Sequence, residues 1–347
     1  MTVVMATHNR ASMLAEAVAS VERQETSVPF EAVIVDNASS DGTPQVLAAA
    51  EDRNEWLRAL REPRRGKSYA LNAGVEAARG RILLFTDDDV VAQPGWIEAH
   101  VRFLGDRGGG VVAGGRIEPM TTDGGPWPWW FTAGCTDDVP TQLDHGPTRR
   151  LEHAFEYVWG ANLAMAREAF DRFGPWNPQA GTPGSYTGQF PKPRSAPAED
   201  VVFNDRVREL GGEVWFVSDA TVRHRVRAGE VTPRRIVMTA YSRGFGEYSY
   251  RRQYGAYWSV PPVAERVDRG PIQQWALLVL HLLGWLAASV AFRIARSPRA
   301  FDRARRAALS ASWVVAGISE RSDLGARVAA RLGAFVRRAS LRLVESD

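Results

Sequence analysis

The strongest constraint on the fold is a regular alternation of short apolar runs with longer amphipathic segments over the first 117 residues. The amphipathic segments predict helices near 11–22, 43–51, 68–79 and 94–104, and the apolar runs typical of strands occupy 2–6, 32–36, 57–60, 82–86 and 111–117. Strands that alternate with helices in this way favour a parallel α/β sheet. The run at 32–35 is uniformly apolar, as expected for a strand that helices cover on both faces.

Three consecutive carboxylates, Asp87, Asp88 and Asp89, follow the apolar run at 82–86 directly. Side chains alternate along an extended chain, so Asp87 and Asp89 can face the same way and share a divalent cation. Open α/β sheets bind ligands at the carboxyl ends of their strands, where this triplet lies. Taken alone, an acidic triplet could also be a solvated turn.

Length and composition indicate a globular protein, because 347 residues with 45% hydrophobic content can bury a substantial core. Cys135 is the single cysteine, which excludes an intramolecular disulfide and favours a reducing compartment. Residues 1–6 have neither a charged leader nor a long apolar core, so we expect a first strand there and not a secretion signal.

Positive charge is concentrated towards the C-terminal end. Residues 293–347 contain twelve arginines and five acidic residues, whereas the whole chain has a formal charge of only +3. Because no nucleic-acid-binding module is recognisable, we expect no nucleic-acid partner. Anionic lipid is the favoured partner of the basic segment.

An uncharged stretch at 275–292 is long enough to be considered as a membrane span. The arginines that follow it would hold its C-terminal side in the cytosol and send the preceding domain across the membrane, which argues against a simple span. With the shorter apolar stretch at 307–318, we expect interfacial or re-entrant helices on the cytoplasmic face of the cell membrane, peripheral or monotopic. A helix packed on the core or on a dimer partner is the alternative.

Two irregular stretches interrupt the pattern. Residues 118–155 include the aromatic run 126–131, which would either line a ligand site or form a packed flap. Residues 180–197 predict a long loop, functional or disordered, ahead of Glu199 and Asp200.

Four further polar segments line up with the acidic triplet. They are Thr7-His-Asn-Arg10 after the first strand, Asp36-Asn-Ala-Ser-Ser-Asp-Gly-Thr43 after the second, Gly66-Lys-Ser-Tyr-Ala-Leu-Asn-Ala-Gly74 at a helix start, and Glu199-Asp200 before an amphipathic helix, with His224 downstream. In this order they resemble the inverting family 2 glycosyltransferases of the GT-A fold, over about residues 1–225.

The resemblance implies a Rossmann-like GT-A domain, with a mixed α/β sheet flanked by helices, over residues 1–230. We expect a nucleotide-binding half at about 1–117 and an acceptor half at about 118–230. A helical connector at 231–270 and an apolar, Arg-rich helical membrane-associated region at 271–347 would follow.

The resemblance also implies roles for single residues. Asp36 would contact the nucleobase, and Asp87 and Asp89 would serve the ribose and the metal. Lys67, at a helix start, could meet ribose or diphosphate. The other expected donor-binding residues are Thr7, Asn9, Arg10, Asn72 and Asp88. Asn9 could equally cap a helix, Asn72 could only pin its loop, and Asp41 is expected to cap its own turn.

The metal is expected to be Mn²⁺ or Mg²⁺. Asp89 would be its primary ligand, with Asp87, and His224 matches the position where relatives place a second ligand; a solvent-exposed histidine is the alternative. Asp200 would be the general base and Glu199 would orient the acceptor or tune Asp200. The acceptor side would be formed by Trp159, Gly160, Ala161 and Asn162, although Trp159 could be core.

The sequence therefore predicts a metal-dependent, inverting glycosyltransferase. It would move a sugar from a nucleotide-diphosphate donor, UDP favoured, to a lipid-linked, cell-envelope or polysaccharide acceptor. A P-loop enzyme is excluded because the first glycine of its motif would fall at Arg61. The non-enzyme alternative is a membrane-associated nucleotide-sugar-binding or scaffold protein that has lost turnover.

Overall fold

The computed structural model of the chain describes residues 1–105, 107–139, 141–152, 156–178, 199–226, 231–237, 239–240, 283–285, 287–289, 291 and 296–319. Contacts divide the chain into two compact units. Unit 1 comprises Met1–Met120 and Leu143–Arg225, and unit 2 comprises Thr121–Gln142 and Val226–Asp347. Each unit has a hydrophobic core of its own.

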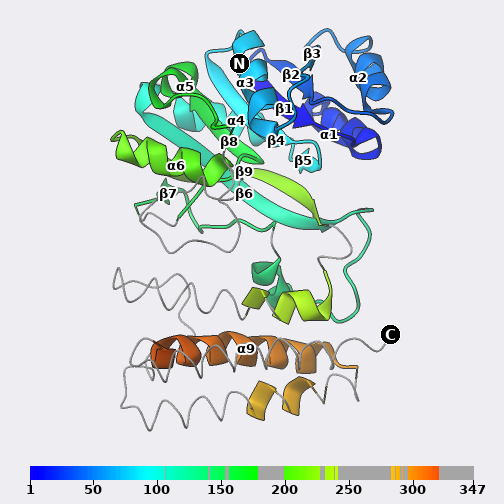
Figure 1. Cartoon of the computed structure of the whole chain (residues 1–347), viewed down its shortest axis with the longest axis vertical. Coiled ribbons are helices and arrows are strands. Elements are labelled where there is room, and N and C mark those ends of the chain that lie inside the picture. Colours follow the sequence, from blue (N-terminus) through cyan, green and yellow to red (C-terminus); the bar gives the residue numbers. More distant parts are fainter. Residues whose placement is uncertain are drawn as a thin grey trace. The chain divides into compact units, whose positions relative to one another are not determined.

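Unit 1 is an α/β sheet with helices on both faces (Figure 1). Its first elements are β1 (Thr2–Thr7), α1 (Ala11–Glu22), β2 (Glu31–Asp36), α2 (Thr43–Glu51), β3 (Leu57–Arg61), α3 (Lys67–Ala77), β4 (Ile82–Asp87), β5 (Val90–Ala92), α4 (Trp96–Leu104), the 3₁₀ turn η1 (Gly108–Gly110) and β6 (Val111–Thr121). After the 3₁₀ turn η2 (Ala133–Asp138) of unit 2 follow β7 (Arg149–Arg150), β8 (Asn162–Ala166), α5 (Arg167–Phe173), α6 (Glu199–Glu209) and β9 (Glu213–Val226).

The strands run in the order β3-β2-β1-β4-β8-β6-β9-β5, with β7 paired to β9. β1 pairs in parallel with both β2 and β4, and β2 pairs in parallel with β3. The strands and helices predicted up to residue 86 are confirmed, with ends shifted by no more than two residues. The register places Thr7 beside Asp36 and Ala6 beside Asp87, so the polar strand ends meet at one edge of the sheet.

The second half of the sheet corrects the prediction of a parallel sheet. β8 runs antiparallel between β4 and β6, so the strand predicted at 111–117 does not pair with β4. Alternation along the chain shows which segments are strands but not which distant strand inserts between them. The short strand β5 was also not predicted, and α4 begins at Trp96 instead of 94. The mixed sheet implied by the family resemblance is confirmed.

Local chemistry fixes the turns that precede the helices. Asp41 Oδ1 accepts a hydrogen bond from the Thr43 amide at 2.9 Å, so Asp41 caps its own turn as predicted, with Pro44 in the first turn of α2. Gly66 has φ +138°, a conformation that L side chains rarely adopt. This glycine turns the chain sharply into α3 and makes Lys67 its first residue.

Two core clusters cover the two faces of the sheet. Leu14 of α1 and Ile97 of α4 belong to one cluster, and Leu71 of α3, Phe170 of α5 and Phe203 of α6 belong to the other. All five side chains are less than 9% exposed. Burial of such apolar side chains contributes about 1.5–3 kcal/mol each, so the sheet is a rigid platform for the groups at its edge.

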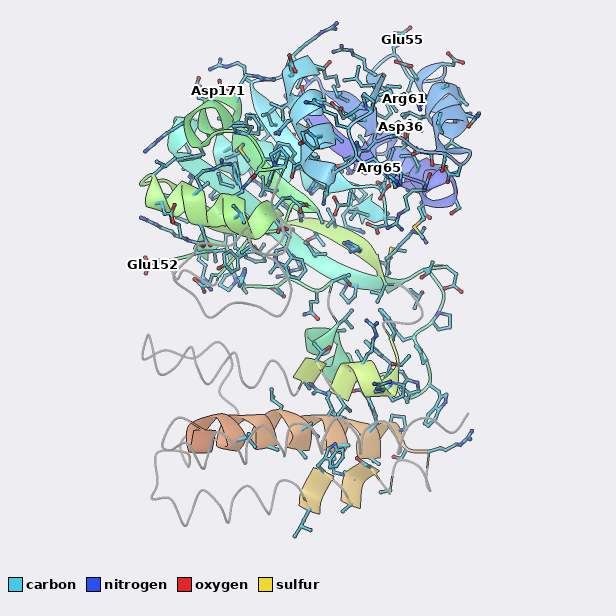
Figure 2. All side chains as sticks on the ribbon, viewed as in Figure 1. Asp36, Glu55, Arg61, Arg65, Glu152 and Asp171 are labelled. Carbon is cyan, nitrogen blue, oxygen red and sulfur yellow. The ribbon has the colours of Figure 1, made fainter. Side chains whose placement is uncertain are left out.

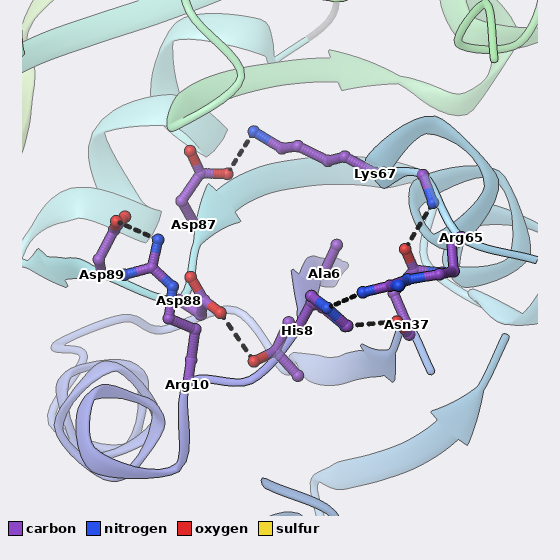
Figure 3. A pocket seen from close by; sticks show the side chains of 11 residues that line it. Ala6, His8, Arg10, Asn37, Arg65, Lys67, Asp87, Asp88 and Asp89 are labelled. Atoms are coloured by element: carbon purple, nitrogen blue, oxygen red, sulfur yellow. Dashed lines mark hydrogen bonds and ion pairs between the residues drawn. The ribbon is translucent and has the colours of Figure 1, made fainter. Parts of the chain in front are cut away.

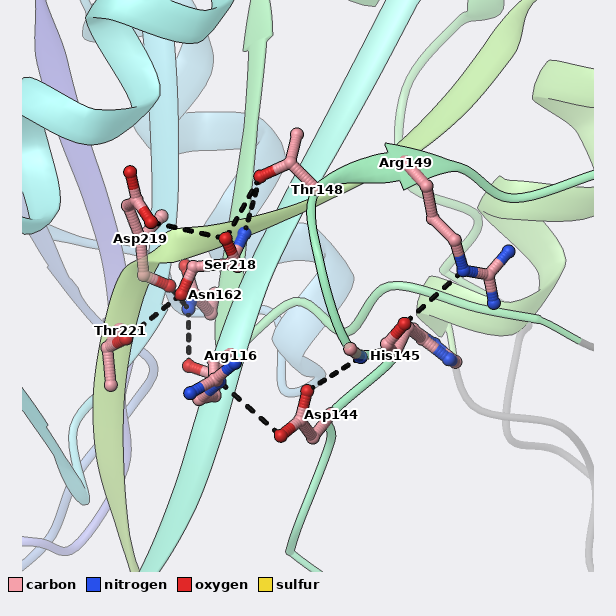
Figure 4. Close-up of polar contacts among 11 residues, drawn as sticks. Arg116, Asp144, His145, Thr148, Arg149, Asn162, Ser218, Asp219 and Thr221 are labelled. Carbon is pink, nitrogen blue, oxygen red and sulfur yellow. Dashed lines mark hydrogen bonds and ion pairs between the residues drawn. The ribbon is translucent and has the colours of Figure 1, made fainter. Parts of the chain in front are cut away.

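Asn162, at the start of β8, joins several elements of unit 1. Its Nδ2 donates to the carbonyls of Arg116 at 2.9 Å and Ala220 at 2.8 Å (Figure 4). Its Oδ1 accepts from Trp96 Nε1 and from His100 Nε2, both at 2.8 Å. The side chain is 0% exposed. Asn162 is therefore a framework residue that ties β6, β8, β9 and α4 together.

Unit 2 packs the aromatic run 126–131 onto its last described helix, α9 (Pro298–Ser319). The Trp130 and Phe301 rings lie 4.8 Å apart, and Trp127 stacks on Phe131 at 4.3 Å. Of the two alternatives for this run, the contacts support a packed flap. Trp129, with 53% of its surface exposed, is the tryptophan of this run that faces outward.

No helix among the described residues is long and apolar enough to cross a membrane. The loop predicted at 180–197 lies outside the described residues, and so does most of the stretches at 231–270 and 275–292. The apolar stretch predicted at 307–318 lies within α9.

Candidate functional site

A pocket of about 410 Å³ opens at the carboxyl ends of β1, β2 and β4 (Figure 3). Pockets of this size hold small-molecule ligands. Of the predicted site residues, the strand edge brings Thr7, Arg10, Lys67 and the acidic triplet together. The full lining is Ala6, Thr7, His8, Arg10, Asn37, Arg65, Gly66, Lys67, Asp87, Asp88 and Asp89.

Asp87, Asp89 and His224 converge on one point beside this pocket. β9 pairs with β5 so that His224 lies opposite Val90, directly after the triplet. One ligand atom from each of the three side chains lies within 4.8 Å of the other two. A divalent ion with ligands at about 2.0–2.6 Å can bridge such atoms. Two carboxylates and an imidazole suit Mn²⁺ as well as Mg²⁺, so the predicted ligand set fits the expected metal.

Two protein cations also contact these carboxylates. Lys67 Nζ lies 2.7 Å from Asp87 Oδ1, and an Arg10 guanidinium nitrogen lies 3.5 Å from Asp89 Oδ2. Burial alone would raise the pKa of Asp87, but Lys67, with smaller contributions from His224 and Arg10, holds that pKa below its usual value. Burial would lower the pKa of Lys67, but Asp87 and Glu199 raise it, so the ammonium stays charged.

Asp88 points away from its two neighbours (Figure 3) and is only 7% exposed. Burial raises its pKa to about 6, although the Thr7 hydroxyl donates to its Oδ2 at 2.7 Å and opposes this shift. Asp89 adds to the increase in pKa. Asp87 and Asp89 thus lie together as predicted, but Asp88 and Asp89 form a turn after β4 and not an extended strand, and the middle carboxyl is bonded to the end of β1.

The predicted catalytic pair is brought to the same site by α6. Glu199 and Asp200 form the first turn of this helix, which corrects the expectation that they precede it. Lys67 Nζ lies 3.2 Å from Glu199 Oε1 and so connects the pair to Asp87. Burial, followed by the charge of Glu199, raises the pKa of Asp200 to about 6, while Lys67 opposes the shift.

The segment predicted to form the acceptor side lies against Asp200. The Gly160 amide donates to Asp200 Oδ2 at 3.2 Å, and the Ala161 carbonyl accepts from the Thr86 hydroxyl at 3.1 Å. Trp159 is half-buried against the core. Asn162 is fully buried, and its side-chain amide is hydrogen-bonded to Trp96 and to the Ala220 carbonyl. Its side chain therefore supports the framework of the site and does not face an acceptor.

The structure places three predicted donor-binding residues outside the pocket lining. Asp36 is 3% exposed and its Oδ1 accepts from the Ser39 amide at 3.0 Å; Figure 2 labels it at the end of β2. Asn9 Oδ1 accepts from the Ser40 amide at 2.8 Å, so Asn9 holds the loop after β2 and does not cap α1, whose N-cap is Arg10. Asn72 bonds both the amide and the carbonyl of Trp176, which pins that loop.

Four residues that sequence reasoning did not assign also shape the site. His8 Nδ1 donates to the Asn37 carbonyl at 2.8 Å, and its Nε2 accepts from Arg65 at 2.7 Å. His8 and Asn37 stand inside the quoted strand-end motifs, which was the available signal. Asn204 is fully buried and bonds the amide and the carbonyl of Val158, which joins α6 to the segment before Gly160. No sequence signal marks Asn204.

A mixed α/β sheet with a polar pocket at its strand ends places the chain in the class of open α/β proteins that bind ligands at this edge. Residues 2–174, about half of the chain, match the family model described as "Glycosyl transferase family 2". The chain belongs to this family. Its α/β fold, with the helices and mixed sheet expected for GT-A enzymes, agrees with that membership.

Two curated proteins are similar to this chain in sequence. The succinoglycan biosynthesis protein ExoO of Rhizobium meliloti (strain 1021) is 31% identical over 161 residues, which cover 45% of each chain. The glucosyl-dolichyl phosphate glucuronosyltransferase of Haloferax volcanii is 25% identical over 232 residues, which cover 65% of this chain and 69% of that protein. The match thus spans less than half of the first relative's length.

A solved structure of a mannosyltransferase from Pyrobaculum calidifontis, in complex with GDP-Man and Mn²⁺, is similar at a TM-score of 0.48 with 17% identity. The alignment covers 92% of this chain and 87% of that one. The structure of GalNAc-T7 with UDP, GalNAc and Mn²⁺ gives a TM-score of 0.49 with 18% identity, over 76% and 52% of the two chains.

The first prediction concerns the ligand set of Asp87, Asp89 and His224. We expect wild-type protein to bind Mn²⁺, and Asp89→Ala to weaken binding by more than about 100-fold, because loss of a direct ligand exceeds the 10–100-fold cost of losing a supporting residue. Mn²⁺ titration followed by electron paramagnetic resonance measures this. The matched control is Asp171→Ala, which replaces an exposed aspartate on α5 (Figure 2). Equal Mn²⁺ affinity in Asp89→Ala and Asp171→Ala would contradict the assignment.

Proposed function

We propose that this protein is an inverting glycosyltransferase that depends on a divalent cation. It would transfer a sugar from a nucleotide-diphosphate donor to a hydroxyl of a lipid-linked, cell-envelope or polysaccharide acceptor. The observation that carries the proposal is that Lys67, which lines the pocket, joins two groups of side chains. A metal-type cluster of Asp87, Asp89 and His224 lies on the donor side, and Asp200 lies on the other, with Lys67 between them.

Asp200 has the properties that a general base requires. Its pKa of about 6 leaves it ionised at neutral pH and still basic enough to remove a proton from an acceptor hydroxyl during attack. The Gly160 amide holds Oδ2, which fixes the direction of the carboxylate. Direct attack by the acceptor oxygen on the anomeric carbon, opposite the leaving diphosphate, inverts the configuration and requires no covalent enzyme intermediate.

The donor side is built to stabilise negative charge. A divalent ion held by Asp87, Asp89 and His224 would act as a Lewis acid on the diphosphate of the leaving group. Lys67 and Arg10 contribute fixed positive charges at the same pocket. Lys67 also stands at the N-terminus of α3, where the helix dipole favours anions.

The nucleobase of the donor and the class of acceptor are proposed from similarity to the family and to the curated relatives. Uridine is the favoured base because of the family resemblance, with Asp36 as its expected partner at the end of β2. The relatives' names refer to succinoglycan biosynthesis and to a glucosyl-dolichyl phosphate, which supports a polysaccharide or a lipid-linked acceptor. A protein that binds the donor without turnover is the alternative, and the base variant below separates the two.

We further propose that the protein works at the cytoplasmic face of the cell membrane. Arg299, Arg303 and Arg306 are exposed on α9 at spacings of three and four residues, which places them on one face of the helix. Buried members of the same helix, including Phe301 and Ala304, face the core of unit 2. An amphipathic helix with an arginine face suits a surface of anionic lipid.

Replacement of the base tests the catalytic proposal. Asp200→Asn should lower kcat by about 10²–10⁴-fold because it removes the proton acceptor, while donor affinity stays within a few-fold of wild type. Transfer is measured with a panel of nucleotide sugars, and donor affinity by calorimetry. Full activity in Asp200→Asn would exclude the base assignment. Donor binding with no transfer by the wild-type protein to any acceptor would favour the inactive binding protein.

The pH profile follows from the raised pKa of Asp200. The base acts only when deprotonated, so kcat/KM should be constant above pH about 7 and fall roughly tenfold per pH unit below about 6. Initial rates at saturating Mn²⁺ between pH about 4.5 and 8 measure this, with the protein checked for folding at each pH. The residual activity of Asp200→Asn should lack the inflection. A wild-type inflection near pH 4 would contradict the account.

Membrane binding is tested with the full chain and vesicles of phosphatidylcholine with or without phosphatidylglycerol. Each arginine near an anionic surface contributes about 1 kcal/mol, so Arg299→Gln/Arg303→Gln should reduce partitioning to anionic vesicles by roughly 30-fold. Arg299→Lys/Arg303→Lys keeps the charges and should bind like wild type. Flotation assays measure the bound fraction. If the wild-type protein bound neutral and anionic vesicles equally, the proposal would be contradicted.

A further inference from the structure

We propose that Glu16 of α1 and Arg225 of β9 form a clamp that orients His224 towards the metal. The inference rests on the proposed function, because it assumes that His224 is a ligand. Neither residue lines the pocket, and neither belongs to a predicted motif. Both would be positioning residues, which set the direction of a ligand without touching the ion.

The orientation of His224 depends on the carbonyl of the next residue. His224 Nδ1 donates its hydrogen to the Arg225 oxygen at 3.0 Å, which assigns the lone pair to Nε2. Nε2 lies 3.5 Å from Asp89 Oδ1 and belongs to the candidate metal cluster. Ligating histidines commonly use their second nitrogen in this way to fix tautomer and ring direction. The position of the Arg225 peptide group therefore sets the position of the ligand atom.

Arg225 is held from two directions. Its amide donates to the Asp89 carbonyl at 3.0 Å, which joins the end of β9 to the acidic triplet. Its guanidinium forms an ion pair with the carboxylate of Glu16 on α1. The Arg225 side chain is 11% exposed and that of Glu16 is 47% exposed, so the pair reaches from the interior to the surface.

The start of the same helix contacts the metal cluster directly. Arg10, the N-cap of α1, contacts Asp89, and Glu16 lies further along the helix. α1 packs through Leu14 and Val18 into the core cluster under the sheet. The helix is thus a rigid support that fixes both the carboxylate and the peptide group behind the imidazole.

The clamp lies at the point in the sequence where unit 1 ends. Arg225 is the last residue of unit 1, and Val226 is the first residue of the second segment of unit 2. The β5–β9 register, with His224 opposite Val90, extends to this point. The ion pair with Glu16 therefore anchors the ligand-bearing strand where the chain leaves unit 1.

Two substitutions of opposite charge separate positioning from simple electrostatics. Glu16→Gln removes a negative charge and Arg225→Gln removes a positive charge, so long-range electrostatics alone predicts weaker Mn²⁺ binding in the first and tighter binding in the second. Positioning predicts weaker binding in both, by about tenfold, at the lower end of the effect of residues that support ligands. The Arg225 amide that bonds Asp89 is retained in the variant.

Matched controls exist on the same elements. Glu22→Gln on α1 and Arg223→Gln on β9 make the same charge changes at exposed positions and should leave Mn²⁺ affinity within about twofold of wild type. The charge-exchanged variant Glu16→Arg/Arg225→Glu restores an ion pair with reversed polarity. It should recover most of the affinity lost in the single variants, which a merely unfolded protein would not do.

Mn²⁺ affinity is measured on the full chain by calorimetry, with excess chelator as the blank and thermal unfolding as a check on folding. Weaker binding in both single variants, with recovery in the exchanged pair, would support the clamp. Tighter or unchanged binding in Arg225→Gln, with normal folding, would overturn it. No chelator-sensitive binding by wild-type protein would instead refute the metal site and the proposed function with it.

Discussion

The site brings four carboxylates together at one edge of the sheet, which costs electrostatic free energy. The rest of the site depends on the groups that offset this cost. Asp87, Asp89, Glu199 and Asp200 approach one another because the strand ends and the start of α6 meet there. Like charges at such distances oppose ionisation, and burial adds to the effect. Lys67 offsets part of this cost by contacting both Asp87 and Glu199. The fold therefore needs positive charge at this point, and a bound divalent ion would supply more of it.

The carboxylates on the two sides of the site differ in the direction of their pKa shifts. On the donor side, Lys67 keeps the pKa of Asp87 low, which suits a group that binds a cation at all working pH values. On the other side, Asp200 lies beside Glu199 and its pKa rises to about 6, which suits proton transfer. Lys67 thus lies between a carboxylate whose pKa is lowered and a pair that includes a carboxylate whose pKa is raised.

Sequence reasoning located the strand ends well because parallel strands bring their carboxyl ends to a common edge, wherever the helices lie. It could not place β8 between β4 and β6, because strand partners far apart in the chain leave no local pattern. It also assigned Asn162 to the acceptor, whereas burial makes it a framework residue. Glu16 and Arg225 carry no motif, since their relation exists only once α1 and β9 have packed.

The central claim is that this pocket binds a nucleotide diphosphate through a divalent metal. Calorimetric titration of the full chain with UDP and with GDP, each with Mn²⁺ and then with excess chelator, tests it most directly. The account predicts that UDP binds in the presence of Mn²⁺, more tightly than GDP, and that chelator abolishes the binding. Absence of binding by both nucleotides, or binding that chelator leaves unchanged, would contradict it.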